Sequence, residues 1–271
     1  MRIPILDGQT YYMEQKLYDN LMQLKKLNEK DYDSLILVWG SVGSGKSTLA
    51  VQTLTALCPD FNLKNVAFNG DAFEDFVLNK SKDRFDSVSI DEAVDGMNSK
   101  EHYKQINIKI EKLLAKMRLK NMYIAACMPR LKDFSEFTIQ RAVLGIKCIT
   151  IKKERGYFFG FSPKRLQQVY YAEKDRKKAW TIHYNFRGRF MDGMGNIGKE
   201  EYRQAKADAF VNYYSKDKKD SKKEISQQEI AIELKQKGWK TIEISKLLHR
   251  PHQTVTDWLQ KHEFSLGKPG F

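Results

Sequence analysis

A glycine-rich stretch that leads into a lysine and two hydroxyl residues is the part of this sequence best suited to chemistry. Gly40, Gly45, Lys46 and Ser47 fit the spacing Gly-x-x-x-x-Gly-Lys-[Ser/Thr] of a phosphate-binding loop. Glycines allow backbone conformations that turn successive N–H groups toward a polyphosphate, and the N-terminus of the following helix adds its positive dipole end. We therefore expect ATP at this loop. The residues expected to surround it are Gly40, Ser41, Val42, Gly43, Ser44, Gly45, Lys46, Ser47 and Thr48.

The lysine and the hydroxyl side chains of the loop are expected to have different roles in binding the nucleotide and its metal ion. We expect Lys46 to reach the β- and γ-phosphates, while the Ser47 hydroxyl takes a place in the coordination shell of Mg²⁺. The apolar run at residues 35–39 and the helix-forming run at residues 48–57 supply the strand and the helix that the motif requires. The alternative is a chance match in a strand, turn and helix that bind no nucleotide.

Two adjacent carboxylates, Asp91 and Glu92, follow a short β-rich run at residues 86–90. We expect Asp91 to hold the Mg²⁺ shell, usually through water, and Glu92 to polarise the water that attacks the γ-phosphate. The pair follows the phosphate loop at an ordinary domain spacing, which favours this interpretation. The alternative is a strand that ends in a solvated acidic turn.

Strands alternate with helices in the first part of the chain, which predicts an α/β fold with a mainly parallel sheet covered on both faces. Apolar residues at helical spacing predict an amphipathic helix at residues 10–30 and a long helix at residues 99–120. The aromatic segment 156–161 is expected to form a β-hairpin or an extension of the sheet. Further strands are expected at residues 66–68, 122–127 and 144–151.

The balance of charge predicts a polyanionic partner. Lysine and arginine number 47 against 34 aspartate and glutamate residues, which gives a formal net charge of +13. Nucleic acid is the commonest such partner for an ATP-binding protein, and a membrane surface is the weaker alternative. The sequence has no N-terminal apolar signal core and no run long enough to span a bilayer, so we expect a cytoplasmic protein without membrane insertion. Cys58, Cys127 and Cys148 lie in apolar settings, which predicts reduced and buried thiols.

The chain changes character beyond residue 151. Residues 152–198 form a basic, β-rich extension, whose mixture of basic and aromatic residues suits either a nucleic-acid groove or a solvated edge with a few core aromatics. A helix is expected at residues 200–214. The expected organisation is an ATPase domain at 1–210 with its core at 33–151, a charged linker at 211–224, and a C-terminal domain at 225–271.

Three short helical patterns occupy the C-terminal segment, at residues 225–237, 241–248 and 252–262. The stretch TIEISKLLHRPHQTVTDWLQ resembles the helix-turn-helix family in its order of supporting helix, tight turn and recognition helix. The resemblance implies a small all-α DNA-binding domain, and a three-helix protein-interaction module is the alternative. In that geometry, the residues placed to meet base edges or phosphate are Arg250, His252, Gln253, Thr254 and Asp257.

The phosphate loop, the Asp91 and Glu92 pair and the stretch KMRLKNMYIAACMPR together resemble the additional-strand P-loop ATPases. Within that class, residues 35–151 are similar to the FtsK/HerA group of DNA-pumping motors and to the related Zot-like and viral packaging ATPases. The glutamate directly after the strand-terminal aspartate carries this placement. The resemblance implies a P-loop NTPase with a RecA-like sheet, ATP and Mg²⁺ as cofactors, double-stranded DNA as a partner and a homo-oligomeric ring, commonly a hexamer.

The resemblance also assigns candidate roles to three arginines. A basic residue before the fourth strand of the motor group often serves the ATP of the neighbouring subunit, and Arg118 stands at the matching place. A surface arginine at a helix C-terminus explains Arg118 equally well. The group often has a polar residue at the end of that strand, where this sequence has Cys127 and Met128. Arg130 or Arg141 is therefore an alternative for the γ-phosphate sensor or for the trans-acting finger.

These features favour an ATP-driven DNA motor of the kind used for viral genome packaging or plasmid DNA transfer. A capsid portal or a transfer complex would then be a further partner, and a viral protein would act in the host cytoplasm. The second hypothesis is an ATP-switched DNA-binding regulator or a replication or transposition factor. The third is a small-molecule kinase with an unrelated C-terminal module, against which Glu92 and the net charge of +13 argue.

Overall fold

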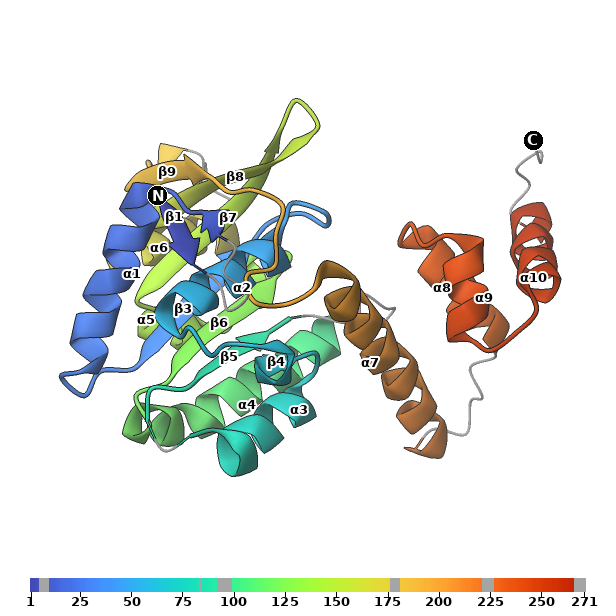
Figure 1. Cartoon of the computed structure of the whole chain (residues 1–271), viewed down its shortest axis with the longest axis horizontal. Coiled ribbons are helices and arrows are strands. Elements are labelled where there is room, and N and C mark those ends of the chain that lie inside the picture. Colours follow the sequence, from blue (N-terminus) through green and yellow to red (C-terminus); the bar gives the residue numbers. More distant parts are fainter. Residues whose placement is uncertain (5–9, 83, 92–98, 176–180, 221–226, 266–271) are drawn as a thin grey trace. The chain divides into compact units, whose positions relative to one another are not determined.

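The computed structural model describes residues 1–4, 10–82, 84–91, 99–175, 181–220 and 227–265 (Figure 1). The chain forms two compact units, residues 1–202 and residues 203–271. The division falls in helix α7 (Lys199–Asp220), which extends into the charged stretch that the sequence indicated as a linker. Residues 211–220 are therefore helical, and residues 221–224 of the expected linker lie outside the described residues.

A seven-stranded sheet forms the centre of the first unit, in the order β4-β5-β6-β3-β7-β8-β9. The first five strands in this order are parallel, whereas β8 and β9 extend the sheet in the antiparallel sense. This arrangement confirms the expected α/β class and the mainly parallel sheet. The strands are β3 (Ser34–Trp39), β4 (Val66–Ala67), β5 (Ser87–Ile90), β6 (Tyr123–Met128), β7 (Leu144–Ile151), β8 (Glu154–Phe161) and β9 (Phe186–Arg189). In a separate two-stranded sheet, β1 (Arg2–Pro4) pairs antiparallel with β2 (Thr10–Tyr12).

The register of the parallel strands brings several strand ends to one edge of the sheet. Trp39 of β3 pairs with Met128 of β6, and Ile90 of β5 pairs with Ala126 of β6. The loop that follows β3 and the carboxylate that follows β5 therefore lie at the same carboxyl edge. Ligands of open α/β sheets bind at this edge, so the fold places the expected site where such sheets hold their ligands.

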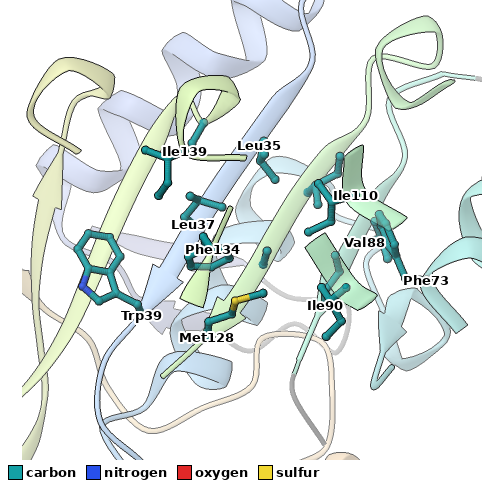
Figure 2. Packing of buried hydrophobic residues seen from close by; sticks show 14 of the residues in the cluster. Leu35, Leu37, Trp39, Phe73, Val88, Ile90, Ile110, Met128, Phe134 and Ile139 are labelled. Carbon is teal, nitrogen blue, oxygen red and sulfur yellow. The ribbon is translucent and has the colours of Figure 1, made fainter. Parts of the chain in front are cut away.

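Helices cover the sheet because β3 and β6 are buried along their whole length and have two faces to shield from water. Leu35, Leu37 and Trp39 of β3 point into a large apolar cluster together with Ile110 of α4 and Ile139 of α5 (Figure 2). On the opposite face, α1 packs against α2. The helical elements of this unit are α1 (Gln15–Asn28), α2 (Lys46–Leu57), η1 (Leu63–Asn65), α3 (Gly70–Asp75), η2 (Phe76–Lys80), α4 (Ser99–Leu119), η3 (Leu131–Asp133), α5 (Glu136–Arg141) and α6 (Pro163–Lys174).

Residues 152–198 contain a helix that the sequence did not indicate, in addition to the strands β8 and β9. Helix α6 begins after Ser162 with a proline in its first turn, and it buries Leu166, Val169 and Tyr170. Because basic and polar residues separate these apolar positions, the sequence pattern did not indicate a helix. The aromatic residues of the extension are largely core: Phe158, Phe161, Phe186 and Phe190 are all buried.

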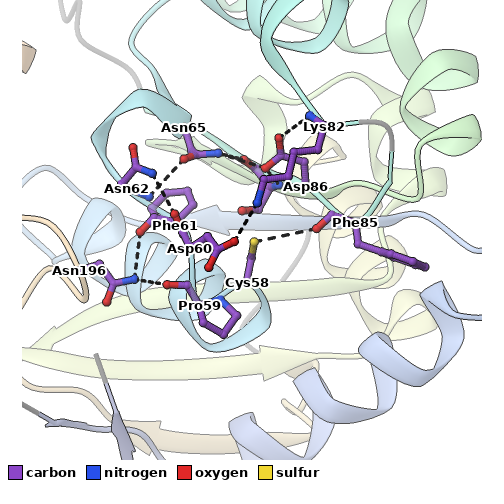
Figure 3. A network of polar contacts seen from close by, with 11 residues as sticks. Cys58, Pro59, Asp60, Phe61, Asn62, Asn65, Lys82, Phe85, Asp86 and Asn196 are labelled. Carbon is purple, nitrogen blue, oxygen red and sulfur yellow. Dashed lines mark hydrogen bonds and ion pairs between the residues drawn. The ribbon is translucent and has the colours of Figure 1, made fainter. Parts of the chain in front are cut away.

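A buried aspartate fixes the start of β5, the strand that leads to the expected metal-binding carboxylate. One side-chain oxygen of Asp86 accepts hydrogen bonds from the backbone N–H of Ser87 at 2.8 Å and from the side chain of Asn65 at 3.2 Å. The other accepts from the backbone N–H of Lys82 at 2.8 Å. Figure 3 shows this network, in which the Lys82 ammonium group also reaches the exposed Asp60. Asp86 therefore ties β5 to the segments before and beside it.

We expect Asp86→Ala to lower the free energy of unfolding by about 2–4 kcal/mol, because it leaves buried N–H groups without an acceptor. Denaturant titration of the variant measures this loss. The matched control is Asp60→Ala, which removes a carboxylate from the same network but from its exposed rim, and should change stability little. Equal stability of the two variants would contradict the anchoring role of Asp86.

The second unit contains three short helices after the end of α7, as the sequence predicted. They are α8 (Gln227–Gln236), α9 (Thr241–Leu247) and α10 (His252–Ser265), and each packs against the other two. Ile244, Val255 and Leu259 are buried between them. None of the helices that the structure describes, in either unit, is both long enough and apolar enough to cross a membrane.

Candidate nucleotide-binding site

Three glycines shape the loop between β3 and α2. Gly40, Gly43 and Gly45 have φ angles of 151°, 76° and 92°, in the region that favours glycine. A Cβ atom on Gly40 would lie 2.3 Å from the carbonyl oxygen of Cys148, and one on Gly45 would lie 2.7 Å from the ring of Phe190. The loop therefore needs glycine at these two positions for backbone conformation and for space.

Several hydrogen-bond donors of this loop are suited to a polyphosphate. The Lys46 ammonium group donates to the carbonyl oxygens of Gly40 at 2.9 Å and Ser41 at 3.1 Å, so it lies across the loop. The Ser44 hydroxyl is buried and has no hydrogen-bond partner within the described parts of the chain. The first N–H groups of α2, which begins at Lys46, have no acceptor within their own helix. An ammonium group, a hydroxyl and helix N–H groups are together the donors that bind phosphate.

Ser47 and Asp91, the two expected Mg²⁺ ligands, meet at one side chain that the sequence did not indicate. The Tyr202 hydroxyl donates to Oδ2 of Asp91 at 2.5 Å, and the nearby side chain of Ser47 acts on the same hydroxyl by lowering its pKa. Asp91 is 2% exposed and Tyr202 is 5% exposed. The Tyr202 ring packs edge-on against Phe68, with ring centroids 5.4 Å apart. The structure therefore brings the hydroxyl end of the loop and the carboxylate after β5 together, with a phenol between them.

The environment of Tyr202 keeps its hydroxyl protonated. Burial, and after it the negative charge of Asp91, raise the pKa of Tyr202 well above that of an ordinary tyrosine. The phenol therefore remains a hydrogen-bond donor to the carboxylate at physiological pH. Burial likewise raises the pKa of Cys148, beside Gly40, to about 12, so this thiol stays neutral.

Glu92, the expected water-polarising residue, lies outside the described residues, which end at Asp91 and resume at residue 99. Cys127, at the expected sensor position, is buried at the end of β6, and its position beside Tyr202 contributes to the raised pKa of that tyrosine. All three cysteines of the chain are buried free thiols, as predicted.

Arg118 and Arg141 lie at the amino edge of the sheet, opposite the loop. Arg141 forms an ion pair with Asp33, which directly precedes β3, at 3.2 Å. A strand rises about 3.3 Å per residue, so the length of β3 separates this pair from the loop by roughly 20 Å. Arg118 is an exposed residue in the last turn of α4, shortly before β6 begins. The expectation that Arg141 senses the γ-phosphate of its own subunit is therefore wrong, because the arginine is too far away.

Arg130 is the candidate arginine on the same side as the loop. It follows Pro129, whose carbonyl oxygen accepts a hydrogen bond from the N–H of Gly40 at 3.2 Å. Its guanidinium group forms an ion pair with Asp133 at 2.8 Å. Arg130 is thus near the loop, but its side chain is oriented toward Asp133, the last residue of the η3 turn.

The expected DNA-reading residues gather around the start of α10. His252, Gln253 and Asp257 are exposed, and Thr254 is half-buried. Gln253 donates to Asp257 at 3.0 Å. Arg250, in the turn before α10, donates to the side chain of Gln227 at 2.7 Å, which holds it against α8. Three of the four α10 residues are therefore exposed, while Val255 and Leu259 of the same helix are buried in the unit.

Sequence reasoning missed Tyr202, Phe190 and Gln52, all of which contribute to this site. Gln52 of α2 donates to the carbonyl oxygens of Met191 at 2.8 Å and Gly193 at 2.7 Å, which ties the segment before α7 to the helix that follows the loop. These contacts join positions far apart in the chain. No local pattern in the sequence marks them.

Comparisons of the chain with protein-family models, with curated proteins and with solved structures found no match. The class of the protein therefore follows from its fold and site alone. It is an α/β protein with a seven-stranded, mainly parallel sheet and a glycine-shaped loop at the carboxyl edge of its central strand.

Proposed function

We propose that this chain is an ATP-hydrolysing motor that moves double-stranded DNA, of the viral genome-packaging or plasmid-transfer type. The observation that carries the proposal is the convergence of Ser47 and Asp91 beside the glycine-shaped loop. The strand order supports the additional-strand class, because β6 lies between β3, which precedes the loop, and β5, which precedes Asp91.

The loop and the Asp91 and Glu92 pair would have different roles in nucleotide binding and hydrolysis. Backbone N–H groups of the loop and the Lys46 ammonium group would hold the β- and γ-phosphates, and Ser47 and Asp91 would hold Mg²⁺. When bound, the ion neutralises charge that develops on the phosphate oxygens. Glu92, next to Asp91 in the chain, would accept the proton of the attacking water.

The position of the arginines supports an oligomeric ring. A finger that acts on a neighbouring subunit must lie on a surface away from the loop of its own subunit. Arg118 and Arg141 satisfy this requirement, since both lie at the opposite edge of the sheet. Such fingers contribute factors of about 10³–10⁵ in rate to P-loop enzymes. Arg118 is the better candidate, because Arg141 is engaged by Asp33.

The hairpin between β7 and β8 supports DNA binding by the first unit. Its two-residue turn consists of Lys152 and Lys153, with φ angles of 50° and 67°, and both are exposed. Figure 1 shows this hairpin extending beyond the sheet. Arg155, just behind the turn, is also exposed but is ion-paired with Asp192 at 2.9 Å. Lysines at the tip of a projecting hairpin are well placed to follow a phosphate backbone.

We expect the double substitution Lys152→Asn with Lys153→Gly to weaken DNA binding and to reduce the slope of log K against log salt by about 2. Asn-Gly is the preferred sequence of a two-residue turn with positive φ, so the hairpin keeps its shape while it loses both charges. Fluorescence anisotropy at several salt concentrations measures the slope. The control, Lys16→Gln with Lys30→Gln, removes two exposed charges, one in α1 and one just after its end. An equal loss in both variants would contradict a specific role of the hairpin.

The second candidate function is an ATP-switched DNA-binding regulator. One observation favours it: Tyr202, which contacts both expected metal ligands, belongs to the helix that continues into the second unit. Nucleotide binding could then change the DNA-binding unit without any movement along DNA. Both functions use the same nucleotide site.

The test is steady-state ATPase activity against duplex DNA of increasing length at fixed salt, with Arg118→Ala mixed into the wild-type protein. A motor that shares sites between subunits should show stimulation that grows with length, and small fractions of the variant should inhibit it disproportionately. Arg141→Ala in a parallel mixture tests whether the other arginine is the finger. A rate independent of DNA length, with inhibition only in proportion to the mixed fraction, would favour the regulator.

A further inference from the structure

Two hydrogen bonds from different parts of the chain hold Asp91, one at its backbone and one at its side chain. Its N–H donates to the carbonyl oxygen of Ala67, the last residue of β4, at 2.9 Å. Its Oδ2 accepts a hydrogen bond from the Tyr202 hydroxyl at 2.5 Å, and both of these side chains are buried. The backbone bond fixes where the carboxylate starts, and the phenol fixes the direction in which it points.

Tyr202 is itself fixed, by its ring and by the first turn of α7. The ring packs edge-on against Phe68, which directly follows β4, with ring centroids 5.4 Å apart. The N–H of Tyr202 donates to the carbonyl oxygen of Gly198 at 2.9 Å. Lys199, the first residue of α7, forms an ion pair with Asp192 at 2.8 Å. The start of α7 is therefore anchored, so the phenol presents its hydroxyl from a fixed place.

The segment before α7 adds to this support, because it is tied to α2 and to the turn that follows α2. Asn196 donates to the carbonyl oxygens of Pro59 at 2.5 Å and Phe61 at 3.0 Å (Figure 3). The side chain of Gln52, in α2, donates to two backbone carbonyl oxygens of the same segment. These contacts hold the segment beside the helix that begins at the loop, and they deliver the first turn of α7 to the carboxyl edge of the sheet.

The hydrogen bond between Tyr202 and Asp91 is compatible with a metal ion at the carboxylate. A carboxylate has two oxygens and about four acceptor positions, and the phenol occupies one of these positions, on Oδ2. Side chains that ligate metals are commonly oriented by a hydrogen bond to a second residue, which does not touch the ion. Tyr202 has the geometry of such a second residue.

We propose that Tyr202 is a positioning residue for the metal site: its hydroxyl holds the Asp91 carboxylate in the orientation that binds Mg²⁺, directly or through a water molecule. This inference rests on the proposed nucleotide site and adds a residue that acts on the ion through Asp91. Loss of an orienting partner of this kind typically weakens metal binding 10–100-fold.

The test compares Tyr202→Phe with the wild-type protein in binding of a fluorescent, non-hydrolysable ATP analogue as Mg²⁺ is titrated. The phenylalanine ring keeps the packing against Phe68 and removes the hydroxyl. The Mg²⁺ concentration at half-maximal binding should therefore rise about 10–100-fold. Binding of the analogue with a chelator in place of Mg²⁺ should stay at the wild-type level, whereas a general loss of structure would weaken binding under both conditions.

Two further variants separate positioning of Asp91 from other effects of the phenol. Tyr11→Phe removes another buried tyrosine hydroxyl, one that donates to the backbone oxygen of Gln52 at 2.6 Å, and should leave the Mg²⁺ requirement unchanged. Asp91→Ala should raise the requirement, and Tyr202→Phe added to Asp91→Ala should raise it no further, because the phenol acts through the carboxylate.

A variant that keeps the phenol serves if Tyr202→Phe does not fold, as thermal unfolding would show. Phe68→Leu weakens only the support of the ring, so the Mg²⁺ requirement should rise about threefold. An unchanged requirement in the folded variant, or an added loss in the double variant, would overturn the role of Tyr202 while nucleotide binding stands. Absence of analogue binding to the wild type would overturn the proposed function, and this inference with it.

Discussion

Lys46→Ala should abolish measurable ATP hydrolysis and weaken nucleotide binding. The Lys46 ammonium group is the charged donor that lies across the loop, where it now contacts the carbonyl oxygens of Gly40 and Ser41. Loss of a charge-assisted hydrogen bond to phosphate should reduce affinity about 10–100-fold. Loss of the stabilising charge in the transition state should reduce kcat by a further factor of about 10²–10³. Equilibrium binding and single-turnover hydrolysis separate the two effects.

The control for this variant is Lys64→Ala, which removes one exposed lysine of the same unit away from the loop. It should hydrolyse ATP at the wild-type rate. Thermal unfolding of both variants checks that the fold is intact, since Lys46 also bonds its own loop. Hydrolysis by Lys46→Ala at a rate close to that of the wild type would refute the phosphate-loop assignment.

Glu92→Gln should leave ATP bound but stop turnover. The substitution keeps the size of the side chain and removes the base that takes the proton from the attacking water. General bases contribute about 10²–10⁴-fold to rate, so kcat should fall by that factor while the dissociation constant of ATP changes little. Rapid-quench measurement of hydrolysis, beside equilibrium binding of ATP, gives both quantities.

The matched control is Glu29→Gln, an equal change of charge at the exposed C-terminal end of α1. If Glu92→Gln turns over normally, another residue polarises the water. Loss of ATP binding in this variant would instead indicate that Glu92 helps to form the binding site. Either result would correct the assignment of Glu92 without affecting that of Lys46.

Local patterns in the sequence were sufficient to predict the loop and the main elements around it. The apolar run before Gly40 became β3, the helix-forming run after Gly45 became α2, and the strand expected at residues 144–151 is β7. These predictions succeed because the spacing of apolar residues in strands and helices, and the positions of glycines, can be recognised within a short stretch of sequence. The three C-terminal helices were predictable for the same reason.

Prediction from local patterns failed at two helices. In α6, basic residues between the apolar positions made the helical spacing of those apolar positions hard to recognise. At the end of α7, a charged stretch that was expected to be a linker is helical. Packing on the sheet stabilises α6 through Leu166, Val169 and Tyr170, and tertiary contacts of this kind override local composition.

The amino-acid sequence by itself determined the candidates for chemistry: the glycines and Lys46 of the loop, Ser47, and the Asp91 and Glu92 pair. Only the tertiary structure decided which of them meet. The order of the parallel strands brings Asp91 to Ser47, places Arg141 at the far edge, and lets Tyr202 reach both expected metal ligands. The physical reason is that strand order and long-range side-chain contacts depend on burial in the folded chain. They cannot be predicted from the types of residues that are adjacent in the sequence.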